Sequence, residues 1–247
     1  MPYEPVSLRW ERLDPREALA RSEAFLETMR ARRSVRMFSP EPVPRELIER
    51  ILTIAGRAPS GSNIQPWKVI VLTGEARAGL SAELVALHEA GDGGSWEYSY
   101  YSDVWREPYL ERRRRCGWGL YGKLGIGKGD RAATKAQQGR NYLFFEAPVG
   151  LIFTIDRDLA RGAWLDTGMF LQSIMVAARS FGLETCPQAA FCPYHEAIGR
   201  RLAIPETEMI VCGMGLGYAD PDAPVNAYRT ERMGLDAFVR FIGGDGE

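Results

Sequence analysis

Arg32-Arg33-Ser34-Val35-Arg36 and Pro59-Ser60-Gly61-Ser62-Asn63-Ile64-Gln65-Pro66-Trp67 are the two stretches around which this chain is organised. The first places three guanidinium groups and one hydroxyl within five residues, at the predicted end of a helix. Guanidinium groups bind phosphates and the flat polar edges of rings through paired hydrogen bonds. The first stretch therefore predicts an anion site that also reaches the rim of a ring.

The second stretch is a turn of small residues, closed by Pro66 and Trp67 and followed by the strand-like run 68–72. Glycine lets the backbone approach a flat ligand closely, and hydroxyl and amide side chains offer donors and acceptors to its rim. Here those side chains are Ser60, Ser62, Asn63 and Gln65. Taken alone, such a segment is usually only a turn, and an arginine-rich helix end is usually solvated.

The two stretches become informative as a pair, with a Pro-Val-Pro helix start at 42–44 between them. Together they strongly resemble the opening of the nitroreductase superfamily of flavin mononucleotide (FMN) enzymes. The resemblance runs from about Glu23 to Phe241. It implies an α+β, nitroreductase-like fold with a mainly antiparallel sheet flanked by helices, assembled as an intertwined homodimer with two flavin sites at the interface.

The composition is that of an ordinary globular protein. Of 247 residues, 45% are hydrophobic and 26% charged, and a net charge of −1 recruits neither nucleic acid nor an anionic membrane. No apolar run is long enough for a membrane span, and Met1-Pro2-Tyr3-Glu4 does not begin a signal peptide. The four cysteines form no Cys-x-x-Cys pair. We therefore expect a cytoplasmic protein with reduced thiols, no metal, and no nucleic-acid or membrane partner.

A length of 247 residues allows one large domain or two small ones, and the resemblance implies a single nitroreductase-like domain over 1–247. Hydrophobic periodicity and capping signals predict its elements. Asp14-Pro15-Arg16-Glu17 reads as a helix N-cap followed by a proline at the first helical position. The run 149–155 is almost continuously apolar, as a central strand would be. Helices are expected from Pro15 to the Arg32 cluster and at about 44–55, 75–88, 134–145 and 166–181, and strands at 68–72, 149–155 and 208–216.

The segment 91–131 mixes aromatic residues with glycines and charges and has no sustained period. Such segments are often lids, and the family that the chain resembles has its variable substrate cap here. We expect substrate contacts from Trp96, Tyr101, Trp105 and Tyr121. The alternative is an irregular helical subdomain whose aromatic residues pack on one another. The run 111–115 reads as a solvated face, or as a source of one arginine that meets the phosphate of a nicotinamide dinucleotide or an acidic substrate.

The resemblance also implies which residues bind FMN. The arginine-rich stretch would grip the phosphate and the pyrimidine edge, and the turn would come from the partner chain. The loop after the long helix would run beside the ring, with a backbone N–H facing the reactive N5. Arg232 is the better match to a basic residue that the family places at the phosphate, and Arg229 is second. The implied cofactor-binding set is Arg32, Arg33, Ser34, Arg36, Pro59, Ser60, Ser62, Asn63, Gln65, Pro187, Gln188, Ala189, Arg229 and Arg232.

The implied reaction is a two-electron, ping-pong reduction driven by NADPH or NADH. The flavin carries the chemistry, so no catalytic side chain is named. The aromatic lid and the stretches 140–150 and 185–190 favour the branch that reduces nitrobenzoate and other nitroaromatic compounds. A quinone acceptor stays open.

Three alternatives remain. A reductive dehalogenase like iodotyrosine deiodinase shares the Arg-Arg-Ser-x-Arg start, and Glu97 and Tyr101 have a spacing that suits its substrate clamp. However, Asn141 stands where that clamp needs a lysine. A flavin-cleaving, benzimidazole-forming relative is the second alternative. The third is a non-catalytic flavin-binding dimer, whose flavin NAD(P)H could not reduce.

Overall fold

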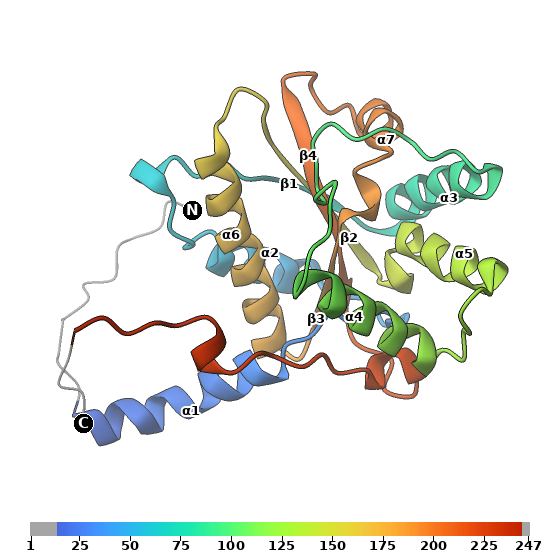
Figure 1. The fold of residues 1–247 in the computed structure, drawn as a ribbon. Coiled ribbons are helices and arrows are strands. Elements are labelled where there is room, and N and C mark those ends of the chain that lie inside the picture. Colours follow the sequence, from blue (N-terminus) through green and yellow to red (C-terminus); the bar gives the residue numbers. More distant parts are fainter. Residues whose placement is uncertain (1–13, 244–247) are drawn as a thin grey trace.

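The structure is a computed structural model that describes residues 14–243. Figure 1 shows a small sheet with helices packed around it, while α1 (Pro15–Ala31) and the C-terminal segment extend from the body on the same side. The stretch Met1-Pro2-Tyr3-Glu4, on which the expectation of no signal peptide rests, lies outside the described residues.

The sheet has the strand order β1-β2-β4-β3, and every pairing in it is antiparallel. β2 (Val149–Asp156) is central and pairs with β1 (Lys68–Leu72) and β4 (Glu208–Gly217). β3 (Glu184–Gln188) forms the outer edge beside β4. The predicted antiparallel sheet is confirmed, and its edge strand β3 comes directly after the long helix Arg161–Ser180.

Helices cover both faces of this sheet. The α-helices described after α1 are α2 (Arg45–Ala55), α3 (Gly74–Ala90), α4 (Tyr109–Lys123), α5 (Arg131–Gly139), α6 (Arg161–Ser180) and α7 (His195–Leu202). Of these, α2 and α6 pack on one face of the sheet and α3 and α7 on the other. Leu151 and Phe153 of β2 pack with α2 and α6, whereas Ile152 packs with α3 and α7. This alternation follows from the period of two along a strand, and it explains why the apolar run of β2 is buried on both sides.

Four elements differ from the sequence prediction. The helix expected at about 134–145 is α5, which ends at Gly139, followed by a 3₁₀ segment over Arg140–Glu146 in which Phe144 and Phe145 have left-handed backbone angles. α6 begins at Arg161, five residues before the predicted start at 166. The sequence carries no start signal at this point, because Ala160 at the N-cap provides no capping side chain. The segment 184–188, expected as a loop, is a strand. Within 91–131, which showed no period, residues 109–123 form the regular helix α4, none of whose residues is buried. A helix without a buried face leaves no apolar stripe in the sequence.

None of the helices described between residues 14 and 243 has the length and apolar character needed to cross a membrane.

Candidate functional site

The arginine-rich stretch is fastened to the edge strand β3. α1 ends at Ala31, as predicted, and Ser34 then forms an isolated bridge with Thr185. The Val35 N–H donates to the Thr185 carbonyl at 3.1 Å, and the Val35 side chain is fully buried. Because Val35 is anchored in the core, the polar side chains on either side of it are held outside the core, along β3.

Asn226, which the sequence analysis did not single out, joins the C-terminal segment to this stretch. Its Oδ1 accepts the Arg36 N–H at 3.0 Å, and its carbonyl oxygen accepts a hydrogen bond from Arg33 Nη1 at 2.9 Å. Its Nδ2 donates to the carbonyls of Met37 and Asp220, at 2.7 and 2.9 Å. One buried amide therefore brings segments about 190 residues apart into one site.

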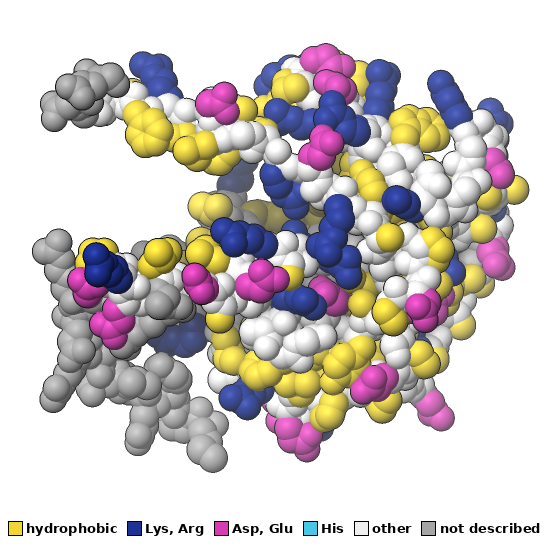
Figure 2. Space-filling view, turned by 90° about the horizontal axis from the view of Figure 1, so that it is seen from below, with side chains coloured by type: hydrophobic (Ala, Val, Ile, Leu, Met, Phe, Trp, Pro, Cys, Tyr) yellow, Lys and Arg dark blue, Asp and Glu magenta, His cyan; other side chains and the backbone are white. Residues whose placement is uncertain are grey.

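A cavity of about 640 Å³ lies where these segments meet. Figure 2 shows a hollow on the side where α1 and the C-terminal segment extend, with Lys and Arg side chains gathered at its inner end. The cavity lining includes six of the predicted cofactor residues: Arg32, Arg33, Ser34, Arg36, Arg229 and Arg232. The structure thus brings together the two predicted halves of the phosphate site.

The electrostatics of this cavity favour an anion. Burial lowers the pKa of Arg32, and the charge of Arg232 lowers it further. Burial likewise lowers the pKa of Arg33, with an added effect of Arg229. Arg33 Nε is buried and has no hydrogen-bond partner within residues 14–243. A phosphate would offset the repulsion between these guanidinium groups and would accept a hydrogen bond from the unused donor.

Glu184 supplies a counter-charge at the base of this cluster. Its side chain is 4% exposed and accepts a hydrogen bond from Arg179 Nη1 at 2.7 Å. Burial raises the pKa of Glu184, and the charges of Arg179, Arg33 and Arg32 offset part of that rise. A single buried carboxyl therefore offsets only part of the positive charge around the cavity.

The predicted turn is exposed and held by α6. The Gly61 N–H lies 3.2 Å from both carboxylate oxygens of the buried Asp166, and the Gln65 N–H donates to Ser60 Oγ at 3.0 Å. Ser62, Asn63 and Gln65 all have positive φ angles, between 48° and 58°. Left-handed backbone at three such residues costs on the order of 1 kcal/mol each and is typical of ligand-binding loops.

This turn does not line the arginine cavity of its own chain. Pro59 reaches two other hollows along α6, of about 440 and 760 Å³, while Ser60, Ser62, Asn63 and Gln65 line none of these three. The two stretches that opened the sequence analysis are thus separate within one chain.

A second large cavity, of about 810 Å³, lies at the other end of β3. Pro187, Gln188 and Ala189 line it, as do three aromatic residues, Tyr98, Tyr100 and Trp164. The Tyr98 and Trp164 ring centroids are 4.5 Å apart. Tyr98 is fixed by a 2.6 Å hydrogen bond to the Val211 carbonyl, and burial raises the pKa of its hydroxyl. This cavity can accept a flat apolar ring.

Two charged side chains line the aromatic cavity, and only one of them has a partner of opposite charge within residues 14–243. Glu97 accepts a hydrogen bond from Arg157 and lies 3.4 Å from His195 Nδ1, so its charge is already compensated. Arg161, at the start of α6, lines the same cavity and pairs with no carboxylate of the described residues. The cavity therefore combines aromatic walls with one uncompensated cation.

The four aromatic residues expected to contact substrate are not among those that line the aromatic cavity. Trp96 packs on Tyr98 and Tyr100, and Tyr101 packs on Tyr100 and Trp105. Tyr121 packs on Trp118 of α4. The role of Trp96, Tyr101, Trp105 and Tyr121 stays a prediction, and the sequence analysis missed Tyr98, Tyr100 and Trp164.

The arginine cavity, or cationic cavity, and the aromatic cavity are neighbours along β3, and we call the two together the trough. The neighbours Leu171 and Gln172 of α6 line the aromatic and the cationic cavity, respectively. β3 runs between them, and two of its buried polar atoms, Thr185 Oγ1 and Gln188 Oε1, have no hydrogen-bond partner within residues 14–243. The trough thus offers arginines at one end and aromatic walls at the other.

No cluster of His, Cys, Asp and Glu that could hold a metal ion occurs in the part of the chain that the structure describes.

Known proteins with the same organisation were identified by sequence and by structure. The family model described as Nitroreductase family matches residues 29–218. A 4-nitrobenzoate reductase of Pseudomonas putida is 44% identical over 91% of this chain and 98% of its own length. Among solved structures, the FMN and NADPH-dependent nitroreductase NfnB from sphigopyxis sp. strain HMH has a TM-score of 0.86 and 37% identity, over 89% of this chain and 99% of that one. The FMN-dependent NfnB from Mycobacterium smegmatis, in complex with NADPH, has a TM-score of 0.86 and 32% identity, over 91% of this chain and 100% of that one.

Proposed function

Because the chain belongs to the nitroreductase family, we propose that it holds FMN in the trough along β3 and uses NADPH or NADH to reduce nitroaromatic compounds in the cytoplasm. The main support for the proposal is the cationic cavity, where Arg33 Nε is buried and has no hydrogen-bond partner among the described residues. Bound FMN would supply hydride acceptance and hydride transfer at N5.

The residues of the trough fit the cofactor along its length. Arg32, Arg33, Arg229 and Arg232 would hold the phosphate, because their charges are only partly offset by Glu184. The unpartnered atoms Thr185 Oγ1 and Gln188 Oε1 lie on β3 and would hydrogen-bond to the ribityl chain and the ring. Of the five unpartnered buried side-chain atoms found in the described residues, the remaining two belong to Arg77 and Ser81 on α3.

The second half of the flavin site would come from the partner protomer. The strained turn with Ser60, Ser62, Asn63 and Gln65 faces solvent and lies outside the arginine cavity of its own chain. Exposed apolar side chains lie on α1, on α6 and in the C-terminal segment: Phe25 is 57%, Leu165 69% and Phe241 82% exposed, and the first two line the hollows along α6. Exposed apolar surface beside such hollows suits a protein interface, and we propose an intertwined homodimer that buries it.

The aromatic cavity would accept the donor and the oxidant in turn, as a ping-pong mechanism requires. Tyr98, Tyr100 and Trp164 suit a flat aromatic ring, and the unpaired Arg161 suits an acidic substituent on that ring. Nitrobenzoate has both features. A quinone shares the ring but lacks the acid, so Arg161 favours the nitroaromatic acid as acceptor.

The experiment is an anaerobic visible spectrum of the purified protein before and after addition of NADPH and then of 4-nitrobenzoate. We expect a flavin band that bleaches with NADPH and returns with the nitro compound. A colourless protein that does not take up added FMN would contradict the proposal. A band that NAD(P)H cannot bleach would indicate a non-catalytic binder, and recovery only with halotyrosines would indicate a dehalogenase.

A further inference from the structure

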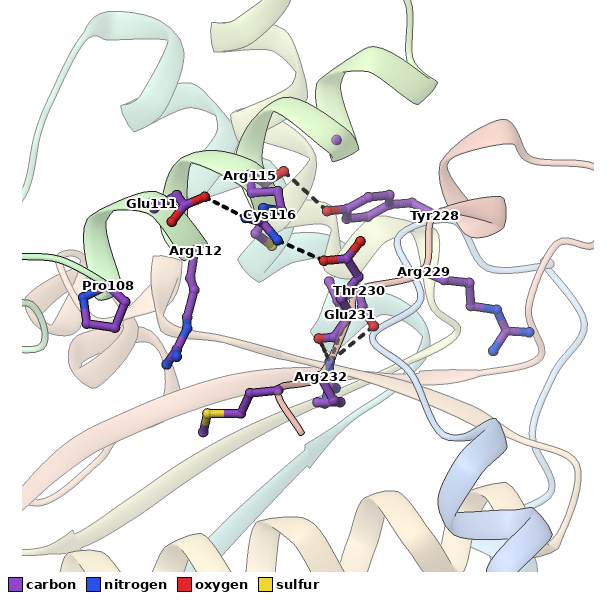
Figure 3. Close-up of a pocket in the computed structure, with 12 residues that line it drawn as sticks. Pro108, Glu111, Arg112, Arg115, Cys116, Tyr228, Arg229, Thr230, Glu231 and Arg232 are labelled. Atoms are coloured by element: carbon purple, nitrogen blue, oxygen red, sulfur yellow. Dashed lines mark hydrogen bonds and ion pairs between the residues drawn. The ribbon is translucent and has the colours of Figure 1, made fainter. Parts of the chain in front are cut away.

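A second cationic cavity, of about 560 Å³, lies between α4 and the C-terminal segment (Figure 3). It shares Cys116 and four residues of the segment 228–232 with the proposed flavin-phosphate cavity, so the two cavities are neighbours. Its lining carries four arginines and two glutamates, namely Arg112, Arg115, Arg229, Arg232, Glu111 and Glu231. It is therefore a second site for a negative charge beside the first.

The charges in this second cavity are distributed unequally. Both glutamates pair with Arg115, Glu111 at 2.5 Å and Glu231 at 2.8 Å. Arg232 Nη1 donates to Thr230 Oγ1 at 2.7 Å and to the Glu231 carbonyl at 2.9 Å. Arg115 is thus compensated by carboxylates, whereas Arg232 is only held in place by neutral oxygens.

Arg112 is the cation left over in this cavity. Its guanidinium lies 5.9 Å from the centroid of the Tyr109 ring, and none of the carboxylates between residues 14 and 243 pairs with it. Figure 3 shows its side chain extending from α4 into the space below that helix, while Arg229 points to the opposite side. Arg229 can therefore serve the flavin phosphate while Arg112 stays available for a second anion.

We propose that this cavity binds the ribose 2′-phosphate of NADPH and that Arg112 contacts it. The inference rests on the proposed function, which brings a nicotinamide dinucleotide to the trough. β3 is five residues long, about 13 Å between its first and last residues, and leads from the cationic to the aromatic cavity. An extended dinucleotide with its nicotinamide at the aromatic end places its adenosine near the cationic end.

The 2′-phosphate is the group of NADPH that suits the unpaired charge of Arg112. It is a dianion at neutral pH, and guanidinium groups bind phosphate oxygens by charge-assisted hydrogen bonds. NADH has a hydroxyl at the same position, which gains little from Arg112. The cavity would therefore make the enzyme select NADPH over NADH.

The test is Arg112→Gln in the full-length holoenzyme. Anaerobic stopped-flow reduction gives kcat/KM for NADPH and for NADH, and we expect the NADPH to NADH ratio to fall by roughly 10- to 100-fold. Calorimetric titration with 2′,5′-ADP is a second readout, which needs no turnover. The wild type should bind 2′,5′-ADP more tightly than 5′-ADP, and the variant should lose that difference.

Two control variants make the outcome specific. Arg114→Gln removes an exposed arginine of the same helix that does not line the cavity, and its ratio should match the wild type. Arg112→Lys keeps the charge and should restore part of the preference. An equal loss for both dinucleotides would mean that Arg112 contacts the pyrophosphate, and it would overturn the assignment, as would an unchanged ratio.

Failure of the proposed function gives a different result. A protein without flavin, or one whose flavin neither dinucleotide reduces, contradicts the oxidoreductase proposal. The 2′,5′-ADP titration then still decides whether the Arg112 cavity recognises a 2′-phosphate.

Discussion

At the scale of single residues, Asn226 determines whether the C-terminal segment lies against the arginine-rich stretch. Asn226→Leu would leave the half-buried Arg36 N–H and the Met37 carbonyl without their partners. We expect a loss of about 2–4 kcal/mol in unfolding free energy, together with lower flavin content. Denaturant unfolding and the ratio of flavin to protein absorbance measure the two effects.

Ala227→Leu provides the control for Asn226, because Ala227 is the exposed neighbour in the same short helix. Its unfolding free energy should stay within about 0.5 kcal/mol of the wild type. Equal stability of both variants would show that the Asn226 hydrogen bonds do not hold the segment.

Glu184 makes the unfolding free energy depend on pH, and the burial of its carboxyl determines the sign of that dependence. Its pKa is raised in the folded apoprotein, so the folded state binds its proton more tightly than the unfolded state does. Its contribution to stability is therefore present below the unfolded pKa and is lost as the pH rises through the folded pKa. Relative to Glu184→Gln, the wild-type apoprotein should lose unfolding free energy as the pH rises above the ordinary glutamate pKa of about 4.3, as measured by denaturant titrations. A difference that stays constant as the pH rises would contradict the assignment.

Residue chemistry was predictable where several functional groups crowd one stretch. The arginines at 32–36 stand out in the sequence, and six of the predicted cofactor residues meet in one cavity. Asn226 could not be found in this way, because a lone asparagine in a turn-rich segment looks like a turn residue. Its function depends on contacts across about 190 residues.

At the scale of elements, α4 docks on the C-terminal segment through a glycine. A Cβ on Gly119 would lie 2.5 Å from the Tyr228 ring. We expect Gly119→Ala to push Tyr228 away, to destabilise the protein by about 1–2 kcal/mol and to weaken binding in both cationic cavities. Thermal unfolding and FMN titration would show the change.

The matched substitution for Gly119→Ala is Gly117→Ala on the same helix, where a Cβ would meet nothing within 4 Å. There the gain in helix propensity should stabilise the protein by about 0.5–1 kcal/mol. If Gly119→Ala were as stable as Gly117→Ala, the close approach of Tyr228 would not constrain the docking of α4.

Elements were predictable where burial imposes a period. β2 and α2 pack into the core and were placed to within a residue or two. α4 has no buried residue, so its sequence carries no apolar stripe. β3 is short, lies at the sheet edge and contains Pro187, so neither its length nor its propensity marks it as a strand.

At the scale of the whole molecule, the apolar surface of α1 is the feature that a dimer would explain. Phe25 and Met29 line a hollow of about 760 Å³ with residues of α2 and α6. Phe25→Arg would place a charge in the proposed interface, so we expect monomers and a loss of flavin. Sedimentation velocity and visible absorbance measure both.

Val104→Arg adds the same charge at another exposed apolar residue, 80% exposed in the segment before α4, and should leave the oligomeric state unchanged. A Phe25→Arg protein that still sediments as a dimer would remove α1 from the interface.

The separation of the arginine cavity from the Ser60 turn has a consequence for handling the protein. If each flavin needs groups from two chains, its retention follows the law of mass action in subunit concentration. Dilution would strip the cofactor where dialysis of a concentrated sample would not. The yellow colour of a preparation would then report how much of the protein is paired.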